Sequence, residues 1–84
     1  MQVKIEKKAA KEINKLDTLT ANRIIDFIEG LVNIDPRSKG KALKGKFKHL
    51  WRYRVGEYRI LTEIKDEVLV ILVVRVSHRS RTYC

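Results

Sequence analysis

The chain ends in nine residues, VSHRSRTYC, that place arginines, a histidine and a tyrosine directly after its most apolar run, VLVILVV. Guanidinium groups carry paired N–H donors that match the oxygens of a phosphate, so Arg79 and Arg81 are candidate phosphate ligands. Tyr83 has no apolar neighbours in this segment, which favours a place at the surface. Two interpretations stay open. The segment is either a solvated tail, or the end of a strand that holds a polar site against one face of a sheet.

Positive charge is concentrated in two stretches of the sequence. The net charge is +9, yet residues 37–59 hold nine Lys or Arg against one acid, and residues 75–84 hold three Arg and no acid. The rest of the chain holds seven basic and nine acidic side chains. This distribution indicates a polyanionic partner such as nucleic acid. The alternative is a generally basic protein without a specific nucleic-acid role.

The length of 84 residues predicts one domain, residues 1–84, and the hydrophobic fraction of 44% predicts that it folds. The first twelve residues contain no apolar stretch typical of a signal peptide, and residues 68–74 are too few to span a bilayer, which needs about 20. Cys84 has no second cysteine to pair with. We therefore expect a cytoplasmic protein.

The amino-terminal half predicts a short strand and two helices. Residues 2–6 alternate in the period of a strand, and residues 7–16 place three apolar side chains on one helical face. Asp17 or Thr18 can cap a second helix, which we expect Pro36 to end. Its apolar stripe has the spacing of a core-facing helix. The expected core positions of the two helices are Ala10, Ile13, Leu16, Ala21, Ile24, Ile25, Ile28, Leu31 and Val32.

The carboxyl-terminal half predicts an antiparallel meander of three strands, residues 51–55, 58–64 and 68–74, joined by short turns. The last strand is apolar on both faces, which is typical of a central strand. The expected fold is therefore α+β in the order β-α-α-β-β-β, with both helices on one face of a mainly antiparallel, four-stranded sheet.

Strand alternation then predicts where the arginines lie. If the apolar residues of the hairpin at residues 51–60 face the helices, then Arg52, Arg54 and Arg59 face away from them. Residues 75, 77 and 79 share one parity beyond the apolar run. We expect the uncovered face of the sheet to collect arginines from three strands.

Two other motifs carry little weight. The segment GKALKGK has the Gly and Lys spacing of a phosphate-binding P-loop, but Phe47 occupies the place of the required Ser or Thr, and a strand instead of a helix follows. As a flexible loop, its region still offers Lys44, Lys46 and Lys48 to a phosphate backbone. The soft ligands His49, His78 and Cys84 lack the spacing of a zinc site, so we expect no metal and no cofactor.

The segments LWRYRVGEYRI and VSHRSRTY, together with the size and element order, resemble the RelE/ParE superfamily of bacterial and archaeal toxins. In that superfamily, RelE-like members cut mRNA in the ribosomal A site, ParE-like members inhibit DNA gyrase, and a cognate antitoxin wraps and neutralises the toxin. The resemblance implies a toxin, and its RelE-like branch implies an endoribonuclease.

By position, the resemblance assigns Arg59 and Arg79 to the phosphate and Tyr83 to the tyrosine near the carboxyl end. Arginine is a poor base because its pKa exceeds about 12, so the candidates for proton transfer are Tyr83 and His78. Arg52, Arg54 and Arg81, with the three lysines of the loop, are the expected RNA ligands.

The expected partners are a cognate antitoxin with acidic and apolar side chains, and mRNA on the ribosome, including contacts with 16S rRNA. Two alternatives remain: a ParE-like toxin that inhibits gyrase without hydrolysis, and an inactive relative that binds only RNA or its antitoxin.

Overall fold

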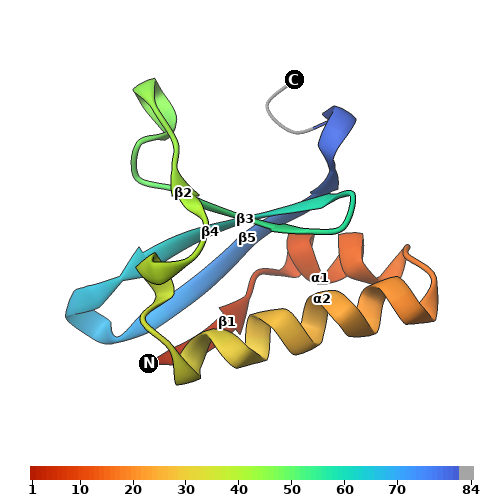
Figure 1. The fold of residues 1–84 in the computed structure, drawn as a ribbon, viewed down its shortest axis with the longest axis horizontal. Helices are drawn as coiled ribbons and strands as arrows, with labels where there is room; N and C mark the ends of the chain where they lie inside the picture. Colours follow the sequence, from red (N-terminus) through yellow and green to blue (C-terminus); the bar gives the residue numbers. More distant parts are fainter. Residues whose placement is uncertain (82–84) are drawn as a thin grey trace.

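A computed structural model describes residues 1–81 of the chain, with two helices packed on one face of a mixed sheet (Figure 1). Within these residues the strands are β1 (Gln2–Ile5), β2 (Lys41–Ala42), β3 (Trp51–Val55), β4 (Tyr58–Lys65) and β5 (Val70–His78). The helices are α1 (Lys7–Asn14) and α2 (Thr18–Gly30). The α+β architecture with two N-terminal helices on one face is thus confirmed.

The sheet has the order β1-β5-β4-β3-β2, so its described part has five strands instead of the four expected. Strand β1 pairs parallel to β5, and the other neighbours are antiparallel. The additional strand, β2, lies in the basic connection and pairs only Lys41 with Arg52 and Ala42 with Trp51. Two residues are too few to show a period of alternation, which is why the sequence did not predict it.

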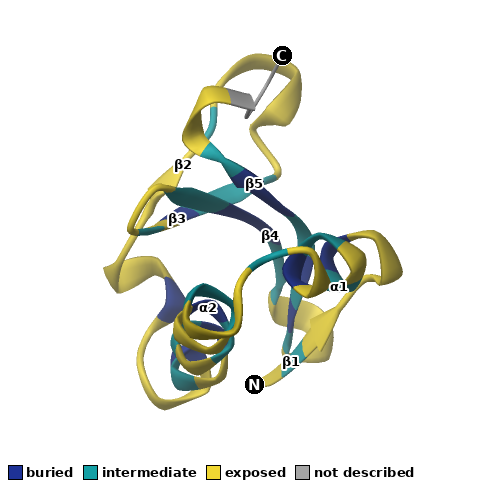
Figure 2. Cartoon of the chain, turned by 90° about the vertical axis from the view of Figure 1, so that its right-hand side faces the viewer, coloured by how far each residue is buried: buried dark blue, intermediate teal, exposed yellow. Residues whose placement is uncertain are grey.

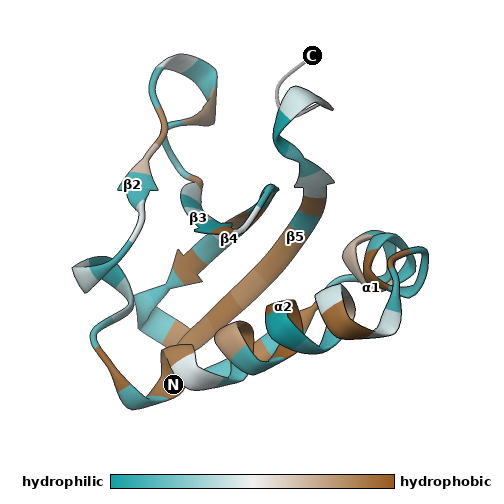
Figure 3. Ribbon diagram, turned by 45° about the vertical axis from the view of Figure 1, so that its right-hand side comes forward, coloured by the Kyte–Doolittle hydropathy of each residue, from teal (hydrophilic) through white to brown (hydrophobic). Residues whose placement is uncertain are grey.

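Strand β5 lies between β1 and β4, as the apolar composition of the run predicted, and Figure 3 shows it hydrophobic along most of its length. The register between β4 and β5 shifts once: Leu61 lies opposite Arg75, but Thr62 lies opposite Val73. Val74 is therefore an extra residue, a β-bulge that changes which side chains of β5 face the helices beyond this point.

The helices agree with the sequence in type but differ at several positions. The Asp17 side chain caps α2 by accepting a hydrogen bond from the Thr20 backbone N–H, 3.0 Å long. In α1 the buried alanine is Ala9, not Ala10: residues three and four before Ile13 both share its face, and the packing of α1 on β5 decides between them. Helix α2 ends at Gly30, before Pro36, and Val32 is exposed.

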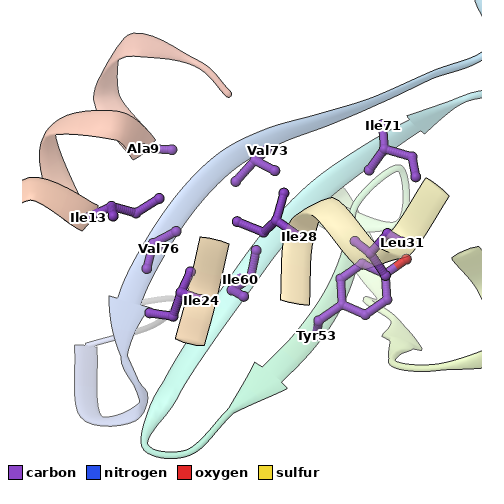
Figure 4. Close-up of a cluster of buried hydrophobic side chains, with 10 residues drawn as sticks. All are labelled: Ala9, Ile13, Ile24, Ile28, Leu31, Tyr53, Ile60, Ile71, Val73 and Val76. Carbon is purple, nitrogen blue, oxygen red and sulfur yellow. The ribbon is translucent and has the colours of Figure 1, made fainter. Parts of the chain in front are cut away.

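The core forms between the helices and the covered face of β3, β4 and β5, and Figure 2 shows the buried residues in this layer. Each fully buried apolar side chain contributes about 1.5–3 kcal/mol of transfer free energy. The cluster drawn in Figure 4 consists of Ala9, Ile13, Ile24, Ile28, Leu31, Tyr53, Ile60, Ile71, Val73 and Val76. Among the described residues, no helix is both long and apolar enough to cross a membrane.

Two aromatic side chains of β3 anchor the chain that leads into the basic connection. The Tyr53 hydroxyl donates to the Pro36 carbonyl at 2.5 Å, and the Trp51 indole Nε1–H donates to the Lys39 carbonyl at 2.7 Å. Burial raises the pKa of Tyr53 to about 12, so the phenol stays protonated and keeps donating. Both aromatics are therefore structural, as their parity with the core predicted.

Glu12 of α1 stabilises the edge of β5 beyond the end of β1. The partner register of β1 stops at Val73, and beyond it the Val76 backbone N–H donates to Glu12 Oε1 at 2.8 Å. The other carboxylate oxygen lies 3.3 Å from Arg75 Nε. A helix side chain thus supplies the acceptor that a longer β1 strand would have supplied.

We predict that Gly40→Ala strongly destabilises the protein. Gly40 has φ +76°, and a Cβ atom there would lie 2.4 Å from the Arg52 carbonyl oxygen and 2.8 Å from Trp51 Nε1. Overpacking of this kind costs about 1–3 kcal/mol, added to the cost of the left-handed backbone. Urea unfolding, followed by the fluorescence of Trp51, measures the loss.

Gly45→Ala is the matched control, because Gly45 has φ +66° but open space around its Cα. It carries the backbone cost without the clash. Equal losses in the two variants would show that the close approach of Gly40 to β3 is unimportant.

We also predict that Glu12→Ala lowers the free energy of unfolding by about 1–3 kcal/mol, because the Val76 N–H loses its acceptor in a partly buried place. Glu12→Gln keeps an acceptor oxygen and should lose less. Glu29→Ala, an exposed acid on α2, is the control. Chemical denaturation of the three variants checks the ranking, and equal stability of Glu12→Ala and Glu29→Ala would contradict it.

Candidate nucleic-acid interface

The face of the sheet that carries no helix collects arginines from the β3–β4 hairpin. In the hairpin register Tyr53 lies opposite Ile60, and both are buried on the helix side. Alternation places the next pair, Arg54 and Arg59, on the other face, directly opposite one another. Arg52 shares this face one pair further along, opposite Leu61. The predicted orientation of Arg52, Arg54 and Arg59 therefore agrees with the register.

The opposition of Arg54 and Arg59 does not favour the fold, because like charges at directly opposite positions of neighbouring strands are destabilising. Arg59 is half-buried, and its Nε atom is buried with no hydrogen-bond partner among the described residues. An unsatisfied buried donor of this kind costs about 1–3 kcal/mol. Both features fit a site that binds an anion.

Nonpolar and weakly polar groups lie between the charged ones. Leu61 and Ser77 are only 7% and 8% exposed, and Ser77 lies opposite Arg59 on the β5 side. Low exposure lowers the effective dielectric constant, and charge–charge interactions strengthen in proportion. An anion bound beside Arg59 would therefore be attracted more strongly than at a fully solvated arginine.

Arg79 begins η5 (Arg79–Arg81), directly after β5, and is fixed by the turn between β3 and β4. Its backbone N–H donates to the Glu57 carbonyl at 2.8 Å, which extends the β4–β5 pairing by one step. Its side-chain Nε lies 2.8 Å from Glu57 Oε2. Arg79 thus stands beside the end of the row formed by Arg54, Arg59 and Ser77.

The register places Arg75 on this face, opposite Leu61, as its parity predicted, but its charge is paired with Glu12 of α1. Arg75 lies at the edge of β5 beyond the end of β1, where its Nε is 3.3 Å from a Glu12 carboxylate oxygen. The ion pair directs the guanidinium to α1. The arginines gathered on the described surface therefore come from β3, β4 and η5.

His78 lies on the other face of the sheet from Arg54 and Arg59, and its expected part in proton transfer stays a prediction. It pairs with Tyr58 across the sheet, and the two rings meet edge to face with centroids 5.5 Å apart. Tyr58 packs against the core, so this pair lies on the helix side, and the His78 Nδ1 is 3.0 Å from the Ser80 Oγ. Beyond the bulge at Val74 the even-numbered residues of β5, Val76 and His78, are the ones on the helix side.

The loop lysines lie on a projecting segment, residues 41–50, which we call the basic arm. Lys44, Lys46 and Lys48 are all exposed around the turn η3 (Gly45–Phe47). Figure 1 shows the basic arm and η5 projecting from the side of the sheet opposite the helices, and Figure 3 shows the same arrangement from another direction. The lysines thus stand at one border of the arginine face and Arg79 at another.

Sequence reasoning missed two features of this interface. A hollow of about 310 Å³ at the outer edge of β3 is lined by Lys39 and Lys41, together with Arg52 and Arg54. The cluster of basic residues at 37–59 contained both lysines, but nothing in it showed which ones meet. Glu57, the one acid in that stretch, was visible in the sequence, although its contact with Arg79 was not.

Some expectations remain outside what the structure describes. Tyr83 lies outside the described residues, and so does the side chain of Arg81, whose backbone ends η5. Within residues 1–81, no three His, Cys, Asp or Glu side chains come together as a possible metal site.

The chain is similar in sequence to two known toxins. Toxin RelG of Mycobacterium tuberculosis is 29% identical over 75 residues, which cover 89% of this chain and 86% of that protein. Toxin RelE of the same organism is 27% identical over 81 residues, which cover 96% of this chain and 84% of that protein.

Among solved structures, the RelBE2 toxin–antitoxin complex of Mycobacterium tuberculosis matches with a TM-score of 0.86 and 28% identity, covering 94% of this chain and 91% of the other. The archaeal RelE–RelB complex of Pyrococcus horikoshii matches with a TM-score of 0.76 and 28% identity, covering 96% and 97%.

The family model of the ParE toxin of type II toxin–antitoxin systems matches residues 3–83, nearly the whole chain. With the two-helix, five-stranded fold and the arginine face in place, the chain belongs to the ParE toxin family of type II toxin–antitoxin systems, within the RelE/ParE superfamily.

Proposed function

We propose that this toxin is a ribosome-dependent endoribonuclease that cuts mRNA in the A site and so blocks translation. The observation that carries the proposal is the cross-strand pair Arg54 and Arg59, with the Arg59 Nε buried and unsatisfied among the described residues. The RelE-like relatives, which include toxins named RelE and RelG, support the same branch.

The proposed reaction is transfer of the phosphodiester from the 5′-oxygen of one nucleotide to the 2′-oxygen of its neighbour. The 2′-hydroxyl loses a proton, its oxygen attacks phosphorus, and the bond to the 5′-oxygen breaks as that oxygen gains a proton. Negative charge builds up on the phosphorane oxygens between these events. Arg59 and Arg79, aided by Arg52 and Arg54, would stabilise that charge through preorganised N–H donors.

Proton transfer is assigned to Tyr83, because arginine does not give up its proton and His78 faces the helices. The lysines of the basic arm, Arg81 and the cationic hollow at the edge of β3 would bind the sugar–phosphate backbones of mRNA and 16S rRNA. The ribosome would orient the substrate, since a site this open gives little positional control by itself.

The proposed protein partner is a cognate antitoxin. The toxin–antitoxin complexes from Mycobacterium tuberculosis and Pyrococcus horikoshii support this, because each pairs a protein of the same fold with its antitoxin. An antitoxin segment with acidic and apolar side chains would neutralise the toxin by covering the arginine face or by displacing the carboxyl-terminal segment.

A second candidate is inhibition of DNA gyrase without hydrolysis, as expected of ParE-like members. The specific observation in its favour is that the matching family model is that of ParE. A gyrase inhibitor has no need of a phosphate clamp, whereas the Arg59 Nε, buried without a hydrogen-bond partner among the described residues, fits one. Cells expressing the toxin would stop translating in the first case and show a DNA-damage response in the second.

We predict that Arg59→Ala lowers mRNA cleavage on programmed ribosomes by about 10²–10³-fold, the usual loss when one donor to a developing oxyanion is removed. Arg59→Lys keeps the charge but loses the planar fork, so it should fall between the alanine variant and the wild type. Single-turnover cleavage with a codon in the A site measures both.

Arg23→Ala is the matched control, because it removes one exposed arginine from α2 on the other side of the sheet. It should cleave within about twofold of the wild type. A wild-type protein that leaves the A-site codon intact would sink the nuclease proposal, and the same preparation would then go to a gyrase supercoiling assay.

We further predict that Tyr83→Phe slows cleavage by about 10²–10⁴-fold at neutral pH while ribosome binding stays unchanged, because general acid–base groups contribute that much to the rate and little to affinity. Rate–pH profiles of the two proteins check this. A phenylalanine variant with wild-type rate would remove Tyr83 from the proton transfer.

A further inference from the structure

Glu57 is an acid that pairs directly with Arg79, one of the arginines of the candidate site. It occupies the two-residue turn between β3 and β4, next to Tyr58 and two positions before Arg59. Its carbonyl oxygen accepts from the Arg79 backbone N–H, and its carboxylate Oε2 lies 2.8 Å from Arg79 Nε. Glu57 thus holds both the backbone and the side chain of Arg79.

The Glu57 carboxylate contacts the Arg79 guanidinium at Nε, so the terminal nitrogens of Arg79 keep donors for another anion. An arginine side chain has five N–H donors, and a carboxylate held at the Nε edge does not use up the fork formed by the two terminal nitrogens. Phosphate oxygens can therefore still be bound by that fork. The contact orders the side chain without removing its capacity to bind an anion.

The ion pair between Glu57 and Arg79 is expected to add little to the stability of the fold. The side chains of Arg79 and Glu57 are 55% and 57% exposed, and exposed pairs contribute little to the free energy of folding. The acid also stands in a stretch otherwise made of cations, where it lowers the attraction for a polyanion. Glu57 therefore weakens the attraction of the protein for a polyanion but fixes the Arg79 side chain. This combination is expected of a residue that positions another side chain.

We propose that Glu57 is a positioning residue, which holds the Arg79 guanidinium in place for the scissile phosphate. The proposal rests on the proposed RNA cleavage. Arginine has a long side chain with many rotamers, and ordering it before the substrate arrives removes that entropic cost from the reaction. Arg59 is ordered by its burial in the sheet, whereas Arg79 lies beyond the end of β5 and is ordered by Glu57.

The test is a double-mutant cycle with Glu57→Ala and Arg79→Ala, measured as single-turnover cleavage on programmed ribosomes and as affinity for a short, 2′-deoxy-substituted RNA that cannot be cut. We expect Glu57→Ala to slow cleavage about tenfold. Arg79→Ala should lower both the cleavage rate and the RNA affinity by a larger factor when Glu57 is present than when it is absent. The reason is that, without Glu57, the Arg79 guanidinium is no longer held in place and already contributes less. Glu57→Gln keeps an oxygen for Nε and should retain most of the wild-type rate.

Asp66→Ala is the matched control. It breaks another exposed pair, Arg37–Asp66, with a separation of 2.8 Å and exposures of 44% and 61%, at the other end of β4. It also removes one acid, so the net charge changes equally. Cleavage and RNA affinity in this variant should follow the change in charge alone.

The outcomes separate the two proposals. If Arg79→Ala lowers the cleavage rate and the RNA affinity by the same factor, or by a larger one, once Glu57 is removed, then Glu57 does not position Arg79. A Glu57→Ala variant that cleaves faster than the wild type would show that the contact is inhibitory instead. If the wild type does not cut mRNA, the nuclease proposal fails, while the cycle on RNA affinity still decides whether Glu57 holds Arg79 for a phosphate.

Discussion

The register of the β3–β4 hairpin is the constraint on which the rest of the structure depends. One pairing, Tyr53 opposite Ile60, puts the hydrophobic half of the hairpin against the helices and forces Arg54 and Arg59 into opposition on the other face. A slip of one residue would bury guanidinium groups and expose the core. The core and the arginine face are therefore selected together, and the fold tolerates the repulsion between the arginines because it cannot be relieved without losing the core.

The projecting segments depend on the same hairpin. Tyr53 and Trp51 reach back to the carbonyls of Pro36 and Lys39, which fixes the point where the basic arm leaves the sheet. Glu57, in the turn of the hairpin, meets Arg79 at the other border. Cationic groups from distant parts of the sequence thus take their positions from a strand pair of thirteen residues. The sheet fixes the positions of the arginines, and the exposed lysines of the basic arm lie at its border.

Much of the fold and of the candidate site could be predicted from residue types. Alternation located β3 and β4 and assigned Arg52, Arg54 and Arg59 to the face away from the helices. The errors have local causes. Residues 41–42 are too few to show a strand, and the choice of Ala9 over Ala10 depends on how α1 packs on β5. The bulge at Val74 was not predicted either, because it leaves no trace in a run that is apolar on both faces.

The sequence by itself determined the fold class, the confinement of positive charge to two stretches and the parity of the hairpin arginines, because periodicity and charge are properties of the chain order. Tertiary structure alone decided which arginines are available: Arg75 is taken by Glu12, Arg79 is held by Glu57, and the Arg59 Nε is buried without a partner among the described residues. The reason is that an ion pair depends on distances across 22 or 63 sequence positions, which are set only when the sheet closes.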